Sequence, residues 1–211
     1  PALAAGYLAG QAATAWPSSD VTDRVPWIAL GALILGGLEA LWPPPAWSRI
    51  ESRLLCAALA VLVMLGPAVQ ESWATKETMG WLSALGLVIV VAWASLESLA
   101  SRSRGVAFAL PMIAMTGGAV AVMLLSGSLV MGQLGGALTA ALAAAWVVSW
   151  WAPPLELGRG SLPVLVLILS ALVLEAHVYA SLTTVGAALV ASSTLAPWVT
   201  RIGPIARLAP W

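Results

Sequence analysis

The chain has 211 residues, of which 61% are hydrophobic and 9% are charged, and its nine basic and nine acidic side chains cancel. A soluble domain carries about 25% charged residues, so this composition excludes an ordinary soluble fold. The balanced charge also excludes a basic face for nucleic acid. The sequence predicts an all-α, polytopic transmembrane helical bundle of about seven spans in a lipid bilayer.

Residues 1–26 are expected to form a marginal helix and a linker ahead of the bundle. Residues 1–16 are rich in alanine and glycine and uncharged, but the run is short for a membrane span. Two interpretations stay open for it, an eighth crossing of the bilayer or a helix lying at the membrane surface.

The bundle itself is predicted over residues 27–200, with a cytoplasmic tail at 201–211. Prolines end the first and fifth spans, because proline cannot continue a helix. The short joint Ser126, Gly127 and Ser128 makes the fourth and fifth spans antiparallel neighbours. The seven expected spans cover about 27–42, 53–69, 79–99, 105–125, 129–151, 162–181 and 184–200.

The basic residues are distributed unevenly between the alternate connections of this arrangement. One side holds only Arg24 and Lys76, and the other holds Arg49, Arg53, Arg102, Arg104, Arg159, Arg201 and Arg207. Because positive charge is retained on the cytoplasmic side, we expect an integral protein of a cell inner membrane with its C-terminus in the cytoplasm. Many of the twelve tryptophans fall near predicted span ends, as in an aromatic belt.

The sixth predicted span, 162–181, carries a carboxyl group in an otherwise aliphatic run. Glu175 lies roughly 20 Å along this helix, which places it inside the hydrocarbon, with Tyr179 one turn beyond it. Its carboxyl could exchange a proton or ion together with Tyr179 and Glu39, or it could fix helix packing through a hydrogen bond. Glu39 and Glu97 lie near span ends, where snorkelling to water is the alternative interpretation.

His177 is the single histidine of the chain, and it points away from Glu175, because positions two apart on a helix lie on opposite faces. We expect it at the membrane interface or in helix packing. A single axial bond to a chlorophyll-type pigment is the alternative, whereas a bis-histidine haem is excluded. The sequence requires no other cofactor and no metal, although bound lipid is expected. One cysteine, Cys56, excludes an intrachain disulfide.

The fifth span carries a ladder of small residues one turn apart: Gly132, Gly136, Ala140 and Ala144. Small side chains let two helix backbones approach closely. This contact supplies packing energy in lipid, where no hydrophobic driving force brings apolar helices together. This ladder predicts either an inner helix or a contact with another chain.

Two functions are compatible with these features. The first is a non-catalytic membrane subunit that packs against other membrane proteins or against itself within an energy-transducing or transport assembly. The alternative is a small proton-coupled transporter that uses Glu175. The chain contains no recognisable nucleophile–base set, so we do not expect an enzyme.

Overall fold

A computed structural model describes residues 24–41, 45–71, 75–100, 109–151, 160–180 and 182–195. The predicted N-terminal helix at 1–16, the tail at 201–211 and the arginines at 102, 104, 159, 201 and 207 lie outside these residues. All the regular secondary structure in the described part of the chain is helical, as predicted.

The described residues form seven helices, and each predicted span overlaps one of them. Of these helices, three are long and apolar enough to cross a membrane: Leu82–Ala100, Leu129–Val148 and Leu162–Tyr179. A helical membrane protein is therefore supported, with three of the seven predicted spans confirmed by length and composition. The helices are α2 (Val25–Leu41), α3 (Ala46–Glu71), α4 (Thr75–Ala100), α5 (Ala109–Leu125), α6 (Leu129–Val148), α7 (Leu162–Tyr179) and α8 (Thr184–Ser193).

Helix α3 begins earlier than the predicted span, at Ala46 instead of residue 53. The carbonyl of Pro45 accepts hydrogen bonds from the Arg49 amide at 3.2 Å and from the Ser48 hydroxyl at 3.0 Å, so this carbonyl already belongs to the helix. Proline before a first turn is favourable because its fixed φ suits helix entry. As a result, Arg49 lies within α3, where the sequence had suggested a connecting loop, and Arg53 lies two turns into the helix instead of at its first residue.

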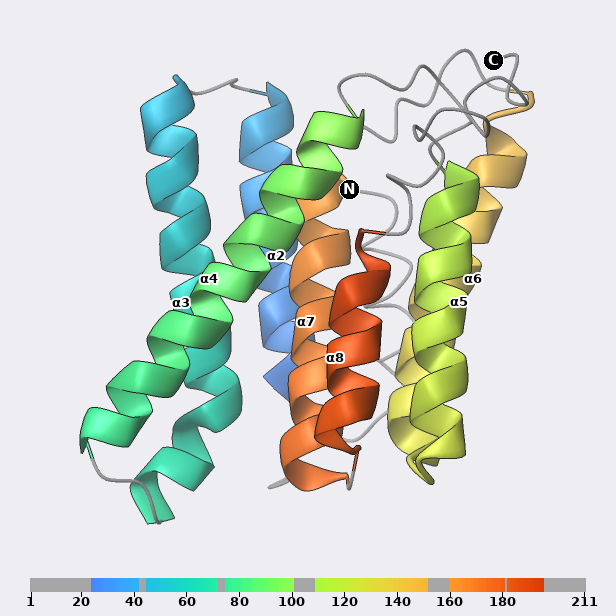
Figure 1. Ribbon diagram of the computed structural model, residues 1–211. Coiled ribbons are helices and arrows are strands. Elements are labelled where there is room, and N and C mark those ends of the chain that lie inside the picture. The colour runs from blue at the N-terminus through green and yellow to red at the C-terminus, as the bar shows by residue number, and fades with distance from the viewer. Residues whose placement is uncertain are drawn as a thin grey trace, which may run out of the picture.

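Helix α7 occupies the centre of the molecule and contacts each of the other six described helices (Figure 1). Its candidate span is 72% buried, against 28% for each of the other two candidate spans. Its aliphatic residues face protein on nearly every side, with Ile168 and Leu172 completely enclosed. This all-round burial explains why its sequence is hydrophobic on all faces.

Helices α5 and α6 form an antiparallel hairpin on one side of α7 (Figure 1). The Ser128 amide donates to the Met123 carbonyl at 3.2 Å and the Gly127 amide donates to the Leu124 carbonyl at 3.0 Å. This Schellman pair of hydrogen bonds needs a left-handed residue after the helix, and Gly127 supplies it with φ of 88°. The three-residue joint therefore turns the chain while its amides satisfy carbonyls in the last turn of α5.

Helix α2 approaches the start of α7 through two glycines. A Cβ atom added to Gly36 would lie 2.3 Å from the carbonyl oxygen of Gly160. Since real Cβ atoms do not come that close to backbone oxygen, this contact depends on glycine at position 36. It fixes one end of α2 against the entrance of α7.

Candidate functional site

Three helices bring charged side chains together at one end of the bundle. Glu39 lies two residues before the end of α2, Glu97 lies three before the end of α4, and Arg53 lies about 10 Å into α3. Since α3 runs opposite to both neighbours, its beginning lies at the same end of the bundle as their ends (Figure 1). We call Glu39, Arg53, Glu97 and Arg49 the charged cluster.

Arg53 is the centre of the charged cluster, and its guanidinium group is bound along two edges. Its Nε donates to Glu39 Oε1 and its Nη2 donates to Glu39 Oε2, both at 3.3 Å. Nη2 also donates to Glu97 Oε1 at 3.1 Å, and Nη1 donates to Glu97 Oε2. Two carboxylates therefore each bind the guanidinium group through both oxygens, the geometry that arginine favours with a carboxylate.

The face of the same guanidinium group lies over an aromatic ring. The Arg53 Cζ atom is 5.0 Å from the centroid of Trp93, which precedes Glu97 by one turn of α4. The Trp93 side chain is completely buried, so the cation–π attraction acts away from water, where it is strongest. Arg53 is thus held on two edges and on one face.

Arg49 completes the charged cluster from one turn earlier on α3. Its Nη1 lies 3.4 Å from Glu97 Oε1, and its side chain is 29% exposed. The two arginines and two glutamates sum to zero charge. A neutral set of ion pairs lowers the cost of burying charge, although losing one partner would leave an uncompensated charge inside the protein.

The charged cluster was not predicted from the sequence, because the two arginines and the two glutamates were not connected with each other. Arg49 and Arg53 were counted as loop charges, and Glu39 was given water as an alternative partner, whereas its side chain is 3% exposed and bound to Arg53. The sequence does contain an indication of the charged cluster, because Arg49 and Arg53 are one helical turn apart, as are Trp93 and Glu97. Such spacing places each pair on one helix face.

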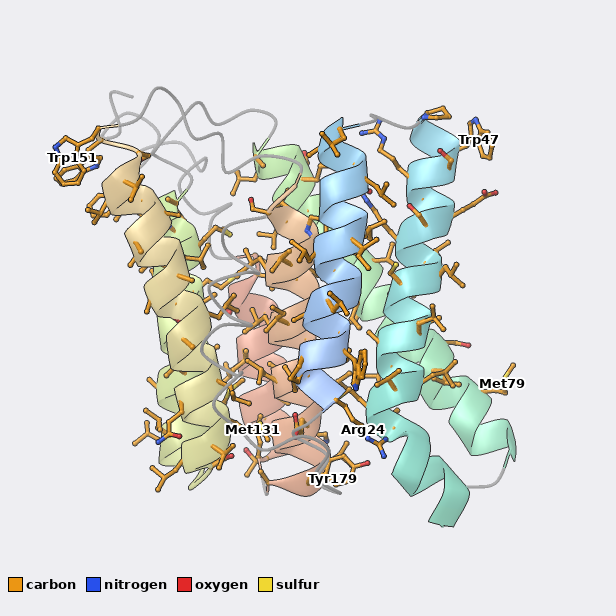
Figure 2. The ribbon with its side chains drawn as sticks, turned by 180° about the vertical axis from the view of Figure 1, so that it is seen from behind. Arg24, Trp47, Met79, Met131, Trp151 and Tyr179 are labelled. Atoms are coloured by element: carbon orange, nitrogen blue, oxygen red, sulfur yellow. The ribbon has the colours of Figure 1, made fainter. Side chains whose placement is uncertain are left out.

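At the other end of the bundle, polar side chains bind carbonyls of α3 near Pro67. Proline has no amide hydrogen, so the carbonyl of Val63, four residues earlier, lacks its helical donor. The Arg24 Nη1 donates to that Val63 carbonyl at 2.8 Å, and the Tyr179 hydroxyl donates to the Met64 carbonyl at 3.1 Å. Arg24 and Tyr179 lie at the same end of the bundle, opposite Trp47 (Figure 2).

Glu175 and Glu39, which the sequence analysis grouped as proton-transfer candidates, lie far apart. Gly160 packs beside Gly36, one turn before Glu39, and Glu175 follows Gly160 by fifteen residues, or about 20 Å along α7. Glu175 is 1% exposed, whereas Tyr179 one turn later is 40% exposed. Glu175 therefore lies within the protein and Tyr179 at its edge.

His177 closes the turn between α7 and α8. Its Nδ1 lies 2.8 Å from the carbonyl oxygen of Leu182, and because a carbonyl can only accept, Nδ1 is the donor. The ring is half-buried, and this bond leaves Nε2 as the nitrogen that a pigment metal would need. Pigment ligation stays a prediction. Within the described residues, no three His, Cys, Asp or Glu side chains gather as a metal site.

The four residues of the small-residue ladder on α6 have different surroundings in the structure. A Cβ on Gly132 would overlap the Leu124 side chain of α5, but a Cβ on Gly136 would meet no atom within 4 Å. Ala140 and Ala144 are exposed. The glycine that packs against both α5 and α7 is Gly135, whose added Cβ would lie 2.8 Å from Val120. Sequence spacing alone did not single it out.

No protein-family model, curated protein or solved structure matches this chain. The roles of the charged cluster, of the carbonyl contacts near Pro67 and of the α6 surface at Gly136, Ala140 and Ala144 therefore follow from their own chemistry.

Proposed function

We propose that the protein is a non-catalytic integral membrane subunit that packs within a larger membrane assembly. The proposal includes the seven-span arrangement in a cell inner membrane, with the C-terminus in the cytoplasm. The 17 residues of α2 and of α5 extend about 25 Å each, and the 26 residues of α3 extend about 39 Å, lengths close to or above the hydrocarbon thickness.

The outward face of α6 carries the proposal. Gly136 has open space beyond it, and Ala140 and Ala144 continue this surface along the same helix. Helices in lipid associate by close backbone approach along such small residues. Since α5 and α7 contact α6 elsewhere, through Gly132 and Gly135, no described helix covers this face, and it can receive a transmembrane helix of another chain or of a second copy.

The use of the charged groups supports a structural role. Arg53, Glu39 and Glu97 are bound to one another across three helices, and these contacts fix the relative positions of the helices. A subunit whose charged side chains bind one another in this way can contribute to an assembly through the shape of its helix surfaces.

The test is the native mass of the protein after extraction from its own membranes in mild detergent. We expect a complex containing further chains or a second copy, and Ala140→Leu should reduce that complex by at least tenfold without lowering thermal stability. Ala121→Leu, at an exposed alanine of the neighbouring helix α5, is the matched control and should leave the complex intact. A free monomer in the unmodified protein would reject the proposal.

A second candidate, a small proton-coupled transporter, is favoured by the burial of Glu175 in the central helix α7. A carboxyl enclosed at this depth could bind and release a proton as the helices move. In liposomes, Glu175→Gln should abolish pH-dependent flux, whereas Glu51→Gln, an exposed glutamate of α3, should leave it unchanged. Equal flux through both variants would remove this candidate.

A further inference from the structure

The charged cluster has the geometry of a ligand site. We propose that Glu39, Glu97 and Trp93 form a recognition box for guanidinium cations, and that the side chain of Arg53 occupies this box in the present conformation. The ligand class is a small guanidinium compound with a short alkyl substituent, which reproduces the end of an arginine side chain.

The contacts match this cation in detail. Glu39 accepts from one edge of the guanidinium plane, through Nε and Nη2, and Glu97 accepts from the adjacent edge, through Nη1 and Nη2. Trp93 covers one face at 5.0 Å. A planar fork with donors on two edges satisfies all three groups, whereas an ammonium ion has neither the fork nor the flat face.

The box and its occupant belong to different helices. Glu39 comes from α2, Trp93 and Glu97 come from α4, and Arg53 comes from α3. Without the Arg53 side chain, Glu39, Glu97 and Arg49 together carry one negative charge, which a single guanidinium cation neutralises. The box therefore selects a monocation by charge as well as by shape.

The box has a more open side at Glu97. The side chains of Glu97 and Arg49 are 25% and 29% exposed, whereas those of Glu39 and Arg53 are 3% and 9% exposed. A free cation would enter past Glu97, which stays partly neutralised by Arg49. Once bound, it takes both carboxylates from Arg53 and thereby removes the links that the Arg53 side chain makes from α3 to α2 and α4.

Tethering makes Arg53 a strong competitor. A group held on the same chain acts at an effective concentration of about millimolar or higher, so a free ligand of equal intrinsic affinity binds the unmodified protein weakly. Removing the Arg53 side chain beyond Cβ should expose the box and leave space for ethylguanidinium, which replaces the missing atoms.

The experiment measures binding of ethylguanidinium to the full-length Arg53→Ala variant in mild detergent, by calorimetry and by the rise in thermal stability that a bound ligand produces. We expect the dissociation constant to be at least tenfold lower than for the unmodified protein. Ethylammonium should bind the variant at least tenfold more weakly than ethylguanidinium.

Two further variants distinguish the box from unspecific charge. Adding Glu39→Gln to Arg53→Ala should abolish binding, whereas adding Glu51→Gln, at the exposed glutamate, should preserve it. If Arg53→Ala folds only with a ligand present, the readout becomes the yield of folded protein extracted with ethylguanidinium compared with ethylammonium. Equal yields, equal affinities for the two cations, or no binding by the folded variant would overturn the proposal.

Discussion

The α2–α3–α4 group and the α5–α6 hairpin are held together by opposite means. In the first, three helices meet at the charged cluster, where Arg53 binds carboxylates from α2 and α4. In the second, no charged residue occurs in either helix, and Gly135 and the Gly127 turn allow close approach. Lipid does not drive apolar helices together, so each region supplies attraction of its own, by ion pairs or by tight packing.

The difference predicts different sensitivities to substitution. A buried ion pair contributes little net stability when it forms, but it is costly to break, because the remaining charge has no water around it. The stability of a closely packed region depends on side-chain volume. The free-energy cost of an added group is limited by how far the neighbouring side chains can move. The charged cluster should therefore tolerate single changes less well than the hairpin does.

The largest effect is expected for Arg53→Met. It leaves the carboxylate of Glu39 buried without its guanidinium partner, which should lower the free energy of unfolding by about 3–5 kcal/mol. Unfolding with SDS in mild-detergent micelles, followed by circular dichroism, measures this loss.

The matched control removes the stranded charge as well. In the double variant Arg53→Met with Glu39→Gln, Arg49 and Glu97 keep a balanced pair, and more than half of the lost stability should return. If the double variant is no more stable than Arg53→Met alone, burial of an unpaired charge is not the reason for the loss.

In the hairpin, Gly135→Ala should cost about 1–3 kcal/mol, because the new methyl group would lie 2.8 Å from Val120 and force α5 and α6 apart. The neighbouring change Gly136→Ala meets no atom within 4 Å and should stabilise the isolated chain by up to about 1 kcal/mol through helix propensity. The same unfolding titration gives both values. Equal signs for the two variants would contradict the packing described for α6.

A smaller loss is expected for Gly127→Ala at the α5–α6 turn. An L side chain at φ of 88° costs roughly 1–2 kcal/mol. Gly127→Asn should cost less, because asparagine tolerates the left-handed conformation, and thermal unfolding of the two variants should rank them in that order. Reversal of the order would mean that the turn does not determine the stability of the hairpin.

Composition and breaker residues were sufficient to predict a helical chain and the approximate places of the seven described helices. The triple proline was interpreted as an end of the first span, but α3 begins directly after Pro45, and this brought Arg49 into a helix and Arg53 away from its first turn. Local sequence cannot show which helices become neighbours. For that reason Glu39 was grouped with Glu175, whereas packing places it beside Arg53.

The small-residue ladder shows the same limit in the hairpin. Its spacing indicated a face that permits close approach, but not which glycine would meet a neighbour within the chain. Gly135 lies one residue from the ladder and makes the contact with α5 and α7. A rotation of 100° per residue separates these two faces of α6, and tertiary packing alone selects between them.

The smallest effect is expected for Trp93→Phe, and it tests which part of Trp93 the charged cluster uses. The indole Nε1 is buried and has no hydrogen-bond acceptor among the described residues, so removing this donor relieves a desolvation cost. Phenylalanine keeps an aromatic face beneath the guanidinium group of Arg53, although tryptophan attracts a cation more strongly. The two changes oppose each other, and the net loss should stay below about 1 kcal/mol in the unfolding titration. Trp93→Leu removes the face entirely and should be clearly less stable than Trp93→Phe. Equal losses for the two variants would show that volume, and not the aromatic face, is what Trp93 contributes to the binding of Arg53.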